Sequence, residues 1–207
     1  MADSHSNIVG FNEVSGGWIH NYSLYYEHAW ELVRDYHNLK KQLIALENEL
    51  RKKPGLNEDE PHFESWISHE TSELSQKLEL VYTSCILYSC MSIEGFINFY
   101  GVKRLGEKNY KKNIERIGIT EKFNVLIMIC FGIMPDHNAP LLKSLRTLFD
   151  VRNSLVHPKT KEMNFEKTHF NNTKLEITTV EETLKLFADH FCEIDSKIKK
   201  EFYFKNA

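Results

Sequence analysis

Residues that break helices or cross-link a chain are scarce in this 207-residue sequence, which has 5 prolines, 9 glycines and 4 cysteines. No two cysteines form a Cys-x-x-Cys pair, so neither a zinc knuckle nor a dithiol redox motif is indicated. We therefore expect reduced core thiols in a cytoplasmic protein. The four thiols are Cys85, Cys90, Cys130 and Cys192.

An excess of charge of one sign is lacking as well. Lys and Arg number 26 against 29 Asp and Glu, which leaves a formal net charge of −3. A nearly neutral protein steers a polyanion only weakly through its long-range field. Any contact with RNA or DNA would therefore need a local basic patch.

Long hydrophobic runs are also missing. The longest apolar run, residues 125–134, has ten residues, about half of the roughly 20 that cross a bilayer. The N-terminus lacks a basic start followed by an apolar stretch, so no secretory signal is expected. We predict a buried helix over this run, a cytoplasmic location and no membrane partner.

The common motifs of cofactor, metal and nucleophile sites are absent too. The sequence has no GxGxxG or GxxxxGK[ST] phosphate loop, no HExxH pair and no GxSxG nucleophile elbow. Its 10 histidines show no spacing typical of metal ligands. We expect neither a cofactor nor a metal site.

What the sequence does contain is helical periodicity on an ordinary globular composition, 42% hydrophobic and 27% charged. Apolar side chains spaced three and four apart place one stripe along a helix at about 19–52. Pro54 and Gly55 end this helix. The stripe consists of Tyr22, Tyr25, Ala29, Leu32, Tyr36, Leu39, Leu43, Leu46 and Leu50.

A second long helix is predicted to begin at residue 61 or 72 and to end near residue 105. Cys85, Ser92 and Gly95 are small residues on its apolar ridge, and small residues allow a neighbouring helix to approach closely. Glu94 lies beside that ridge in an apolar stretch. Because an unpaired buried carboxylate is costly, Glu94 is either exposed or paired with a cation.

Two further helices are expected in the middle of the chain. The first has Thr120 as its N-cap and runs to about residue 130. The second is capped by Asp136 or Asn138 and covers about 140–157. It must stop at 157, because Pro158 supplies no backbone donor and biases the preceding residue away from helical geometry.

A last helix at about 180–201 follows a capping box formed by Thr179 and Glu182. Before it, residues 159–174 are polar and irregular, and residues 175–178 are either a short strand or extended chain. These elements predict a single all-α domain over residues 1–207, an up-and-down bundle of about five helices.

The connection at 103–116 is the most basic stretch of the chain. Its clustered cations either form a solvated loop or contact a phosphate backbone, which requires positive charge but no particular sequence. The candidate RNA-binding side chains are Lys103, Arg104, Lys108, Lys111 and Lys112.

The segment LFDVRNSLVHPK, residues 148–159, carries the most informative polar residues. Arg152, Asn153 and His157 come from the end of one helix, where the last two lie one turn apart on the same face. Arg152 falls on the apolar ridge, so its guanidinium is expected to enter a groove or to face a carboxylate such as Glu94. A helix-terminal histidine and a bundle arginine also occur as purely structural groups. From these residues alone, both a phosphate site and a structural ion pair remain open.

The run RNSLVH at 152–157 resembles the signature of the HEPN domain family, in an all-helical chain with an acidic residue, Glu94, in its second long helix. The likeness extends over residues 22–201 as architecture, and its specific part is the short motif. Many branches of that family look like metal-independent endoribonucleases. They include toxins of toxin-antitoxin pairs and antiviral or abortive-infection RNases, while other branches have lost catalysis.

Carried over to this sequence, the resemblance implies that Arg152 neutralises the scissile phosphate and that His157 acts as general base or acid. It implies that Asn153 orients the site and that Glu94 positions Arg152. Active members of the family pair so that two motifs face one cleft, which implies a homodimer and, for a toxin, an antitoxin or regulatory protein as partner. The chemistry is sound, because histidine titrates near pH ~6.5 and arginine stabilises charge on phosphate oxygens.

Two other interpretations stay open. One is a non-catalytic HEPN-like dimerisation or RNA/nucleotide-binding module, in which Arg152 and His157 only stabilise the bundle. The other is a helical scaffold whose partner surface is the stripe at 22–50. The aromatic tail at 202–204 packs either on the bundle or on a partner.

Overall fold

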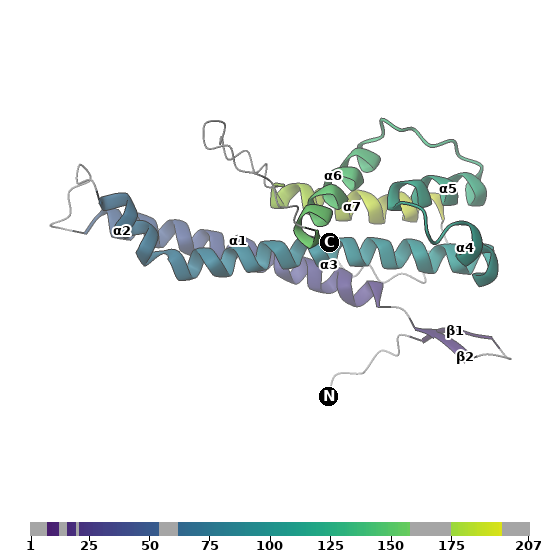
Figure 1. The fold of residues 1–207 in the computed structure, drawn as a ribbon, viewed down its shortest axis with the longest axis horizontal. Helices are drawn as coiled ribbons and strands as arrows, with labels where there is room; N and C mark the ends of the chain where they lie inside the picture. Colours follow the sequence, from purple (N-terminus) through teal and green to yellow (C-terminus); the bar gives the residue numbers. More distant parts are fainter. Residues whose placement is uncertain (1–7, 13–15, 20, 54–61, 158–174, 196–207) are drawn as a thin grey trace.

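The computed structural model describes residues 8–12, 16–19, 21–53, 62–157 and 175–195. These residues form seven α-helices and one two-stranded sheet (Figure 1). The helices are α1 Tyr22–Arg51, α2 Phe63–Glu70, α3 Ser72–Leu105, α4 Glu107–Asn113, α5 Ile119–Phe131, α6 Pro140–Val156 and α7 Ile177–Ile194. The predicted helical architecture is thus confirmed, while the irregular stretch at 159–174 and the aromatic tail at 202–204 lie outside the described residues.

A β-hairpin before α1 contains the only strands in the described part of the chain. Its strands, β1 Ile8–Asn12 and β2 Gly16–Ile19, pair antiparallel with an irregular register between Val9 and Phe11. The β-branched and aromatic residues of this segment favour extended backbone.

The long helices α1 and α3 form an antiparallel hairpin that runs the length of the molecule (Figure 1). The 34 residues of α3 correspond to about 51 Å at ~1.5 Å per residue. The Ser92 hydroxyl donates to the Tyr22 carbonyl at 3.0 Å, and the Cys85 thiol faces the Ala29 carbonyl at 3.7 Å. A Cβ added at Gly95 would lie 3.2 Å from Tyr22 Cβ. Close helix approach at these small residues, expected from the sequence, is therefore confirmed.

The helices α5, α6 and α7 form a second layer on α3, and α7 also contacts α1, so α3 is the central helix of the fold (Figure 1). The core between these layers is aromatic. The ring centroid of Phe96 on α3 lies 4.7 Å from that of Phe191 and 5.4 Å from that of Phe187, both on α7. The Tyr100 ring stacks on Phe131 of α5 at 6.2 Å. This core fixes α3 against the helices that carry the candidate site.

The far half of the α1–α3 hairpin projects as an arm beyond the α5–α7 layer (Figure 1). A small separate cluster of Leu50, Phe63 and Ile67 closes the end of this arm, where α2 packs back onto it. Arg51 and Glu64 join there through two hydrogen bonds of 2.7 and 2.9 Å. The arm thus has its own minor core, separate from the main one.

The predicted apolar stripe on α1 runs along the buried face of the helix, but it contains the wrong residue at two positions. Tyr26 and Val33 are buried, whereas Tyr25 and Leu32 are only half-buried. The buried residues Tyr22, Tyr26, Ala29 and Val33 keep the alternating spacing of three and four, but two of them lie one position after the predicted ones.

The expected number of helices was too low, because two connections are themselves helical. The segment between the two predicted starts of the second long helix, 61 and 72, is a separate helix, α2, and the basic connection contains α4. The segment of α4 has strong helix formers, and Tyr110 anchors it as one of the largest fully buried side chains. The solvated loop, one of the two alternatives for the connection at 103–116, is therefore wrong over 107–113.

Helix caps were predicted less well than helix ends. Helix α5 begins after Gly118 rather than Thr120, and α6 begins after Ala139, with Asp136 instead accepting from the Asn138 backbone at 2.9 Å. Helix α7 begins at Ile177, so the expected start near 180 was wrong. It ends at Ile194, and the predicted continuation at 196–201 lies outside the described residues.

The capping box of Thr179 and Glu182 does not form, because burial of Ile177 and Val180 extends α7 one turn upstream. The Thr183 hydroxyl instead donates to the Thr179 carbonyl at 2.6 Å, inside the helix. Residues 175 and 176, left open between strand and extended chain, form no strand.

The apolar run at 125–134 is buried on one face only. Leu126 and Ile127 are in the core, while Met128 and Ile129 are 43% and 53% exposed. In the described part of the chain, α3 is the single helix long and apolar enough to cross a bilayer. Half of its most apolar window is buried inside the fold, as is usual for the central helix of a helical core.

Candidate functional site

The motif predicted from the sequence lies at the C-terminal end of α6. This helix ends at Val156, and the His157 backbone N–H donates to the Asn153 carbonyl at 2.9 Å. The expected stop at residue 157 is confirmed. Asn153 and His157 are exposed, and Arg152 is half-buried. The structure therefore presents an imidazole and a guanidinium at one helix end.

Arg152 is held by its neighbour in the sequence. Its Nη1 donates to Asn153 Oδ1 at 3.0 Å. A guanidinium has five N–H donors, and within the described residues no carboxylate lies at ion-pair distance from this one. Arg152 thus has donors left for an anion.

The middle of α6 meets α3 at Cys90. The Cys90 Sγ faces the Leu148 carbonyl oxygen at 3.9 Å. Arg152 lies one turn beyond Leu148 on α6, and Glu94 lies one turn beyond Cys90 on α3. Burial raises the pKa of the Cys90 thiol well above its usual range, the Arg152 cation opposes this rise, and the Glu94 carboxylate adds to it. The two charged side chains therefore flank the same thiol.

Glu94 forms its ion pair with a lysine that the sequence analysis did not single out. Lys122 Nζ on α5 lies 3.9 Å from Glu94 Oε1, and no Arg152–Glu94 ion pair forms. The expectation that Arg152 faces the Glu94 carboxylate directly was wrong. The alternative that Glu94 is paired with a cation is confirmed, with Lys122 as that cation.

Lys122 belongs to a buried polar network. Its side chain is 5% exposed, and its Nζ donates to Asn98 Oδ1 at 3.1 Å. The Tyr110 hydroxyl of α4 donates to the same Asn98 oxygen at 2.6 Å. One signal in the sequence points to Lys122, which shares the apolar stripe of Leu126 on α5. The other two residues give no such signal, because their meeting depends on how α4 folds back.

Three of the five cations predicted to bind RNA are engaged within the fold. Lys103 Nζ lies 5.9 Å from the centre of the Phe99 ring. Arg104 donates to Asp195 and, at 2.9 Å, to the Tyr100 hydroxyl. Lys111 pairs with Glu107 at 2.6 Å.

Lys108 and Lys112 are the other two, and both are exposed on α4. Neither forms an ion pair with any described carboxylate. The basic helix does not lie beside the motif. Cys90 and Leu105 are fifteen residues apart on α3, which is about 22 Å along the helix axis. Figure 1 shows α4 at one end of α3 and the base of α6 near its middle.

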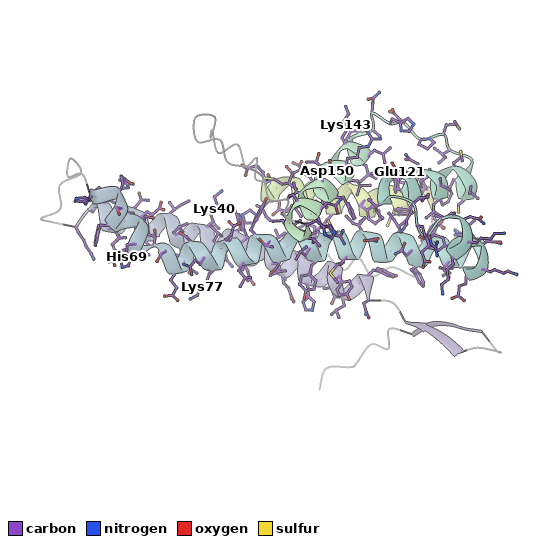
Figure 2. The ribbon with its side chains drawn as sticks, in the orientation of Figure 1. Lys40, His69, Lys77, Glu121, Lys143 and Asp150 are labelled. Atoms are coloured by element: carbon purple, nitrogen blue, oxygen red, sulfur yellow. The ribbon has the colours of Figure 1, made fainter. Side chains whose placement is uncertain are left out.

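The labelled side chains in Figure 2 lie either in the layered part of the fold or on the projecting arm. Figure 2 shows Lys143 and Asp150 on α6 within the layered half of the fold, whereas Lys40, His69 and Lys77 lie on the projecting arm. The arm therefore lies outside the surroundings of the motif. It offers matched positions for control substitutions.

The cysteines show no sign of reactivity. No disulfide joins them, and Cys85 and Cys90 are buried while Cys130 and Cys192 are half-buried. Burial raises the pKa of the Cys85 thiol to about 12. Because the thiolate is the reactive form, Cys85 and Cys90 are poor nucleophiles.

Metal-binding residues do not cluster in the described ranges of the chain. No group of three His, Cys, Asp or Glu side chains there is close enough to hold a metal ion. The groups that converge at the end of α6 are instead a guanidinium, an amide, an imidazole and a paired carboxylate. No protein-family model, curated protein or solved structure matches this chain.

Proposed function

We propose that this chain is a cytoplasmic, metal-independent endoribonuclease of the HEPN type. The observation that carries the proposal is the presence of half-buried Arg152 and exposed His157 at the end of one helix. The hydrogen bond from Arg152 to Asn153 orients the guanidinium and leaves donors for a phosphate. A cation that recognises phosphate and a group that exchanges protons near neutral pH are the parts that RNA transesterification requires.

The proposed reaction begins with attack of a ribose 2′-oxygen on the adjacent phosphorus. The bond from the 2′-oxygen to phosphorus forms and the bond from phosphorus to the 5′-oxygen breaks. A general base takes the proton of the 2′-hydroxyl and a general acid gives one to the leaving 5′-oxygen, with His157 in one of these roles. Arg152 stabilises the charge that builds on the phosphate oxygens. The products are a 2′,3′-cyclic phosphate and a 5′-hydroxyl.

A homodimer would supply a second His157, so that one copy of the residue serves as base and the other as acid. Apolar side chains beside the motif support such pairing. Met91 on α3 follows Cys90 and is 41% exposed, and Val156 precedes His157 and is 44% exposed. In this proposal the two motifs face each other across the symmetry axis. A toxin or antiviral role, controlled by an antitoxin or regulatory protein, follows from the resemblance to HEPN proteins.

A non-catalytic RNA-binding or dimerisation module is the second candidate. The observation in its favour is the hydrogen bond of 3.0 Å between Arg152 and Asn153, which satisfies part of the arginine locally. In this case Arg152 and Lys112 contribute to binding only, and His157 is dispensable.

The test is cleavage of a labelled single-stranded RNA pool in EDTA by the full chain and by Arg152→Ala and His157→Ala variants. The matched controls are Arg146→Ala and His137→Ala, since both residues are exposed and lie outside the motif. We expect cleavage with cyclic-phosphate ends by the wild type and both controls, and loss of at least about a hundredfold in the two motif variants. Folded, dimeric wild type that binds RNA without cleaving it would favour the second candidate.

A further inference from the structure

We infer that Lys122 is a positioning residue of the phosphate site, which acts by holding the Glu94 carboxylate away from Arg152. The inference rests on the proposed role of Arg152 in binding RNA phosphate. Glu94 and Arg152 each lie one turn from the contact between Cys90 and Leu148. A carboxylate so placed would compete with a phosphate for the guanidinium, because both are bidentate partners of arginine.

The structure shows how this competition is avoided. Glu94 Oε1 lies 3.9 Å from Lys122 Nζ, and Glu94 makes no ion pair with Arg152. The lysine is 5% exposed, whereas the Glu94 side chain is 38% exposed. Lys122 is therefore an internal cation, and Glu94 is the more exposed partner of the pair.

The position of Lys122 is unfavourable for a cation that serves only in packing. Lys122 lies in the first turn of α5, which begins at Ile119. A cation is unfavourable at that end of a helix, because the macrodipole is positive there. Burial adds a desolvation cost. The Asn98 oxygen at 3.1 Å offsets part of this cost, and the Glu94 carboxylate supplies the opposite charge.

The network also gives Lys122 a fixed position. Asn98 Oδ1 accepts from the Tyr110 hydroxyl at 2.6 Å as well as from Lys122. Loss of the lysine would leave this oxygen with one donor, so the amide stays satisfied. A Lys122→Met variant, with an unbranched apolar side chain of similar length, is therefore expected to fold.

The experiment measures binding of a short, labelled single-stranded RNA that carries 2′-O-methyl groups, so that no 2′-oxygen can attack. Arg152→Ala sets the scale of binding that depends on the guanidinium. We expect Lys122→Met to weaken binding roughly tenfold, the cost of losing a charge-assisted contact. Adding Glu94→Gln to Lys122→Met should restore most of the affinity, because it removes the competing carboxylate.

A structural role of Lys122 predicts a different pattern, since damage to packing is not repaired by changing Glu94. Binding by Lys122→Met/Glu94→Gln that stays as weak as that of Lys122→Met would overturn the inference. The inference would also be overturned if Lys122→Met bound the RNA as tightly as wild type does. The same holds if Arg152→Ala bound it as tightly as wild type. Thermal unfolding of each variant confirms that it is folded. Restored binding in a protein that cleaves no RNA would refute the proposed nuclease activity and leave the role of Lys122 standing.

Discussion

The Tyr100 hydroxyl on α3 donates a hydrogen bond of 2.9 Å to Asp195 Oδ2, at the residue that follows α7. Arg104 donates to the same carboxylate oxygen and to the Tyr100 hydroxyl. Asp195 is 6% exposed, so this triad fixes the end of α7 to the end of α3 inside the fold. Arg104, expected to bind RNA, is therefore part of the structural framework.

Asp195→Ala is predicted to lower the free energy of unfolding by about 2 kcal/mol. Removing one partner of a buried charge pair is strongly destabilising, but Arg104 is 35% exposed and water offsets part of the loss. Urea denaturation of the variant gives the value directly. Asp189→Ala, an exposed position on the same helix, is the matched control and should change stability by less than about 0.5 kcal/mol. Equal effects of the two substitutions would contradict the structural role of the triad.

Features that depend on neighbouring residues in the sequence were predicted well. The end of α6 at Val156 follows from Pro158, which acts on the residue before it. The close contact of α1 and α3 follows from small residues such as Ser92 on a helical ridge. In both cases the cause lies within a few residues of its effect.

Features that depend on tertiary packing were not predictable in the same way. The partner of Glu94 is Lys122, 28 positions away on another helix, and no spacing rule connects the two. The capping box at Thr179 has the right residues, yet burial of Ile177 starts the helix earlier. Helix α4 forms because its Tyr110 is buried against α3, which charge and turn signals alone do not reveal.

Gly101→Ala is predicted to destabilise the protein although it adds a better helix former. A Cβ at residue 101 would lie 2.2 Å from Tyr110 Cε2. The displaced ring would lose its hydrogen bond to Asn98, so we expect a net loss of about 2 kcal/mol after the helix-propensity gain of roughly 1 kcal/mol.

The matched control for this substitution is Gly95→Ala, where the nearest atom is Tyr22 Cβ at 3.2 Å. The tighter contact at residue 101 predicts a clear difference in melting temperature between the two variants. If Gly101→Ala melts at or above the wild-type temperature, the packing of Tyr110 against α3 is not as the structure has it.

His190 is predicted to make the fold sensitive to acid. Burial lowers the pKa of this imidazole, while Glu193 opposes the shift. Its ring lies 5.4 Å from Phe123, and its Nε2 has no hydrogen-bond partner among the described residues. The unfolded chain therefore binds the proton more readily than the folded one. Stability is fully present above the unfolded value of about 6.5 and is lost as pH falls through the lower folded pKa.

His190→Phe should remove this part of the pH dependence. The variant is expected to gain stability relative to wild type when urea denaturation is moved from about pH 8 to about pH 5. His69→Phe makes the same chemical change at an exposed site on the arm (Figure 2) and should leave the pH dependence unaltered. Parallel pH profiles for wild type and His190→Phe would refute the assignment.

RNA binding by α4 is predicted to depend on Lys108 and Lys112 rather than on all five cations of the basic segment. Both are exposed and neither pairs with a described carboxylate, whereas Lys111 is paired with Glu107 at 2.6 Å. Each phosphate contact on single-stranded nucleic acid contributes about 0.7 to the slope of log affinity against log salt concentration. Lys108→Gln/Lys112→Gln should therefore lower that slope by roughly 1.4.

The control for charge alone is Lys40→Gln/Lys41→Gln, which removes the same two charges from exposed positions on α1. Because long-range steering by a nearly neutral protein is weak, this control should keep the wild-type slope. Fluorescence anisotropy of a labelled RNA over a series of salt concentrations measures both. Since α4 and the motif lie about 22 Å apart along α3, RNAs that are too short to span that distance and that lose binding in Arg152→Ala should bind wild type and Lys108→Gln/Lys112→Gln equally. Unequal binding of such short RNAs would place the α4 contact next to the motif instead.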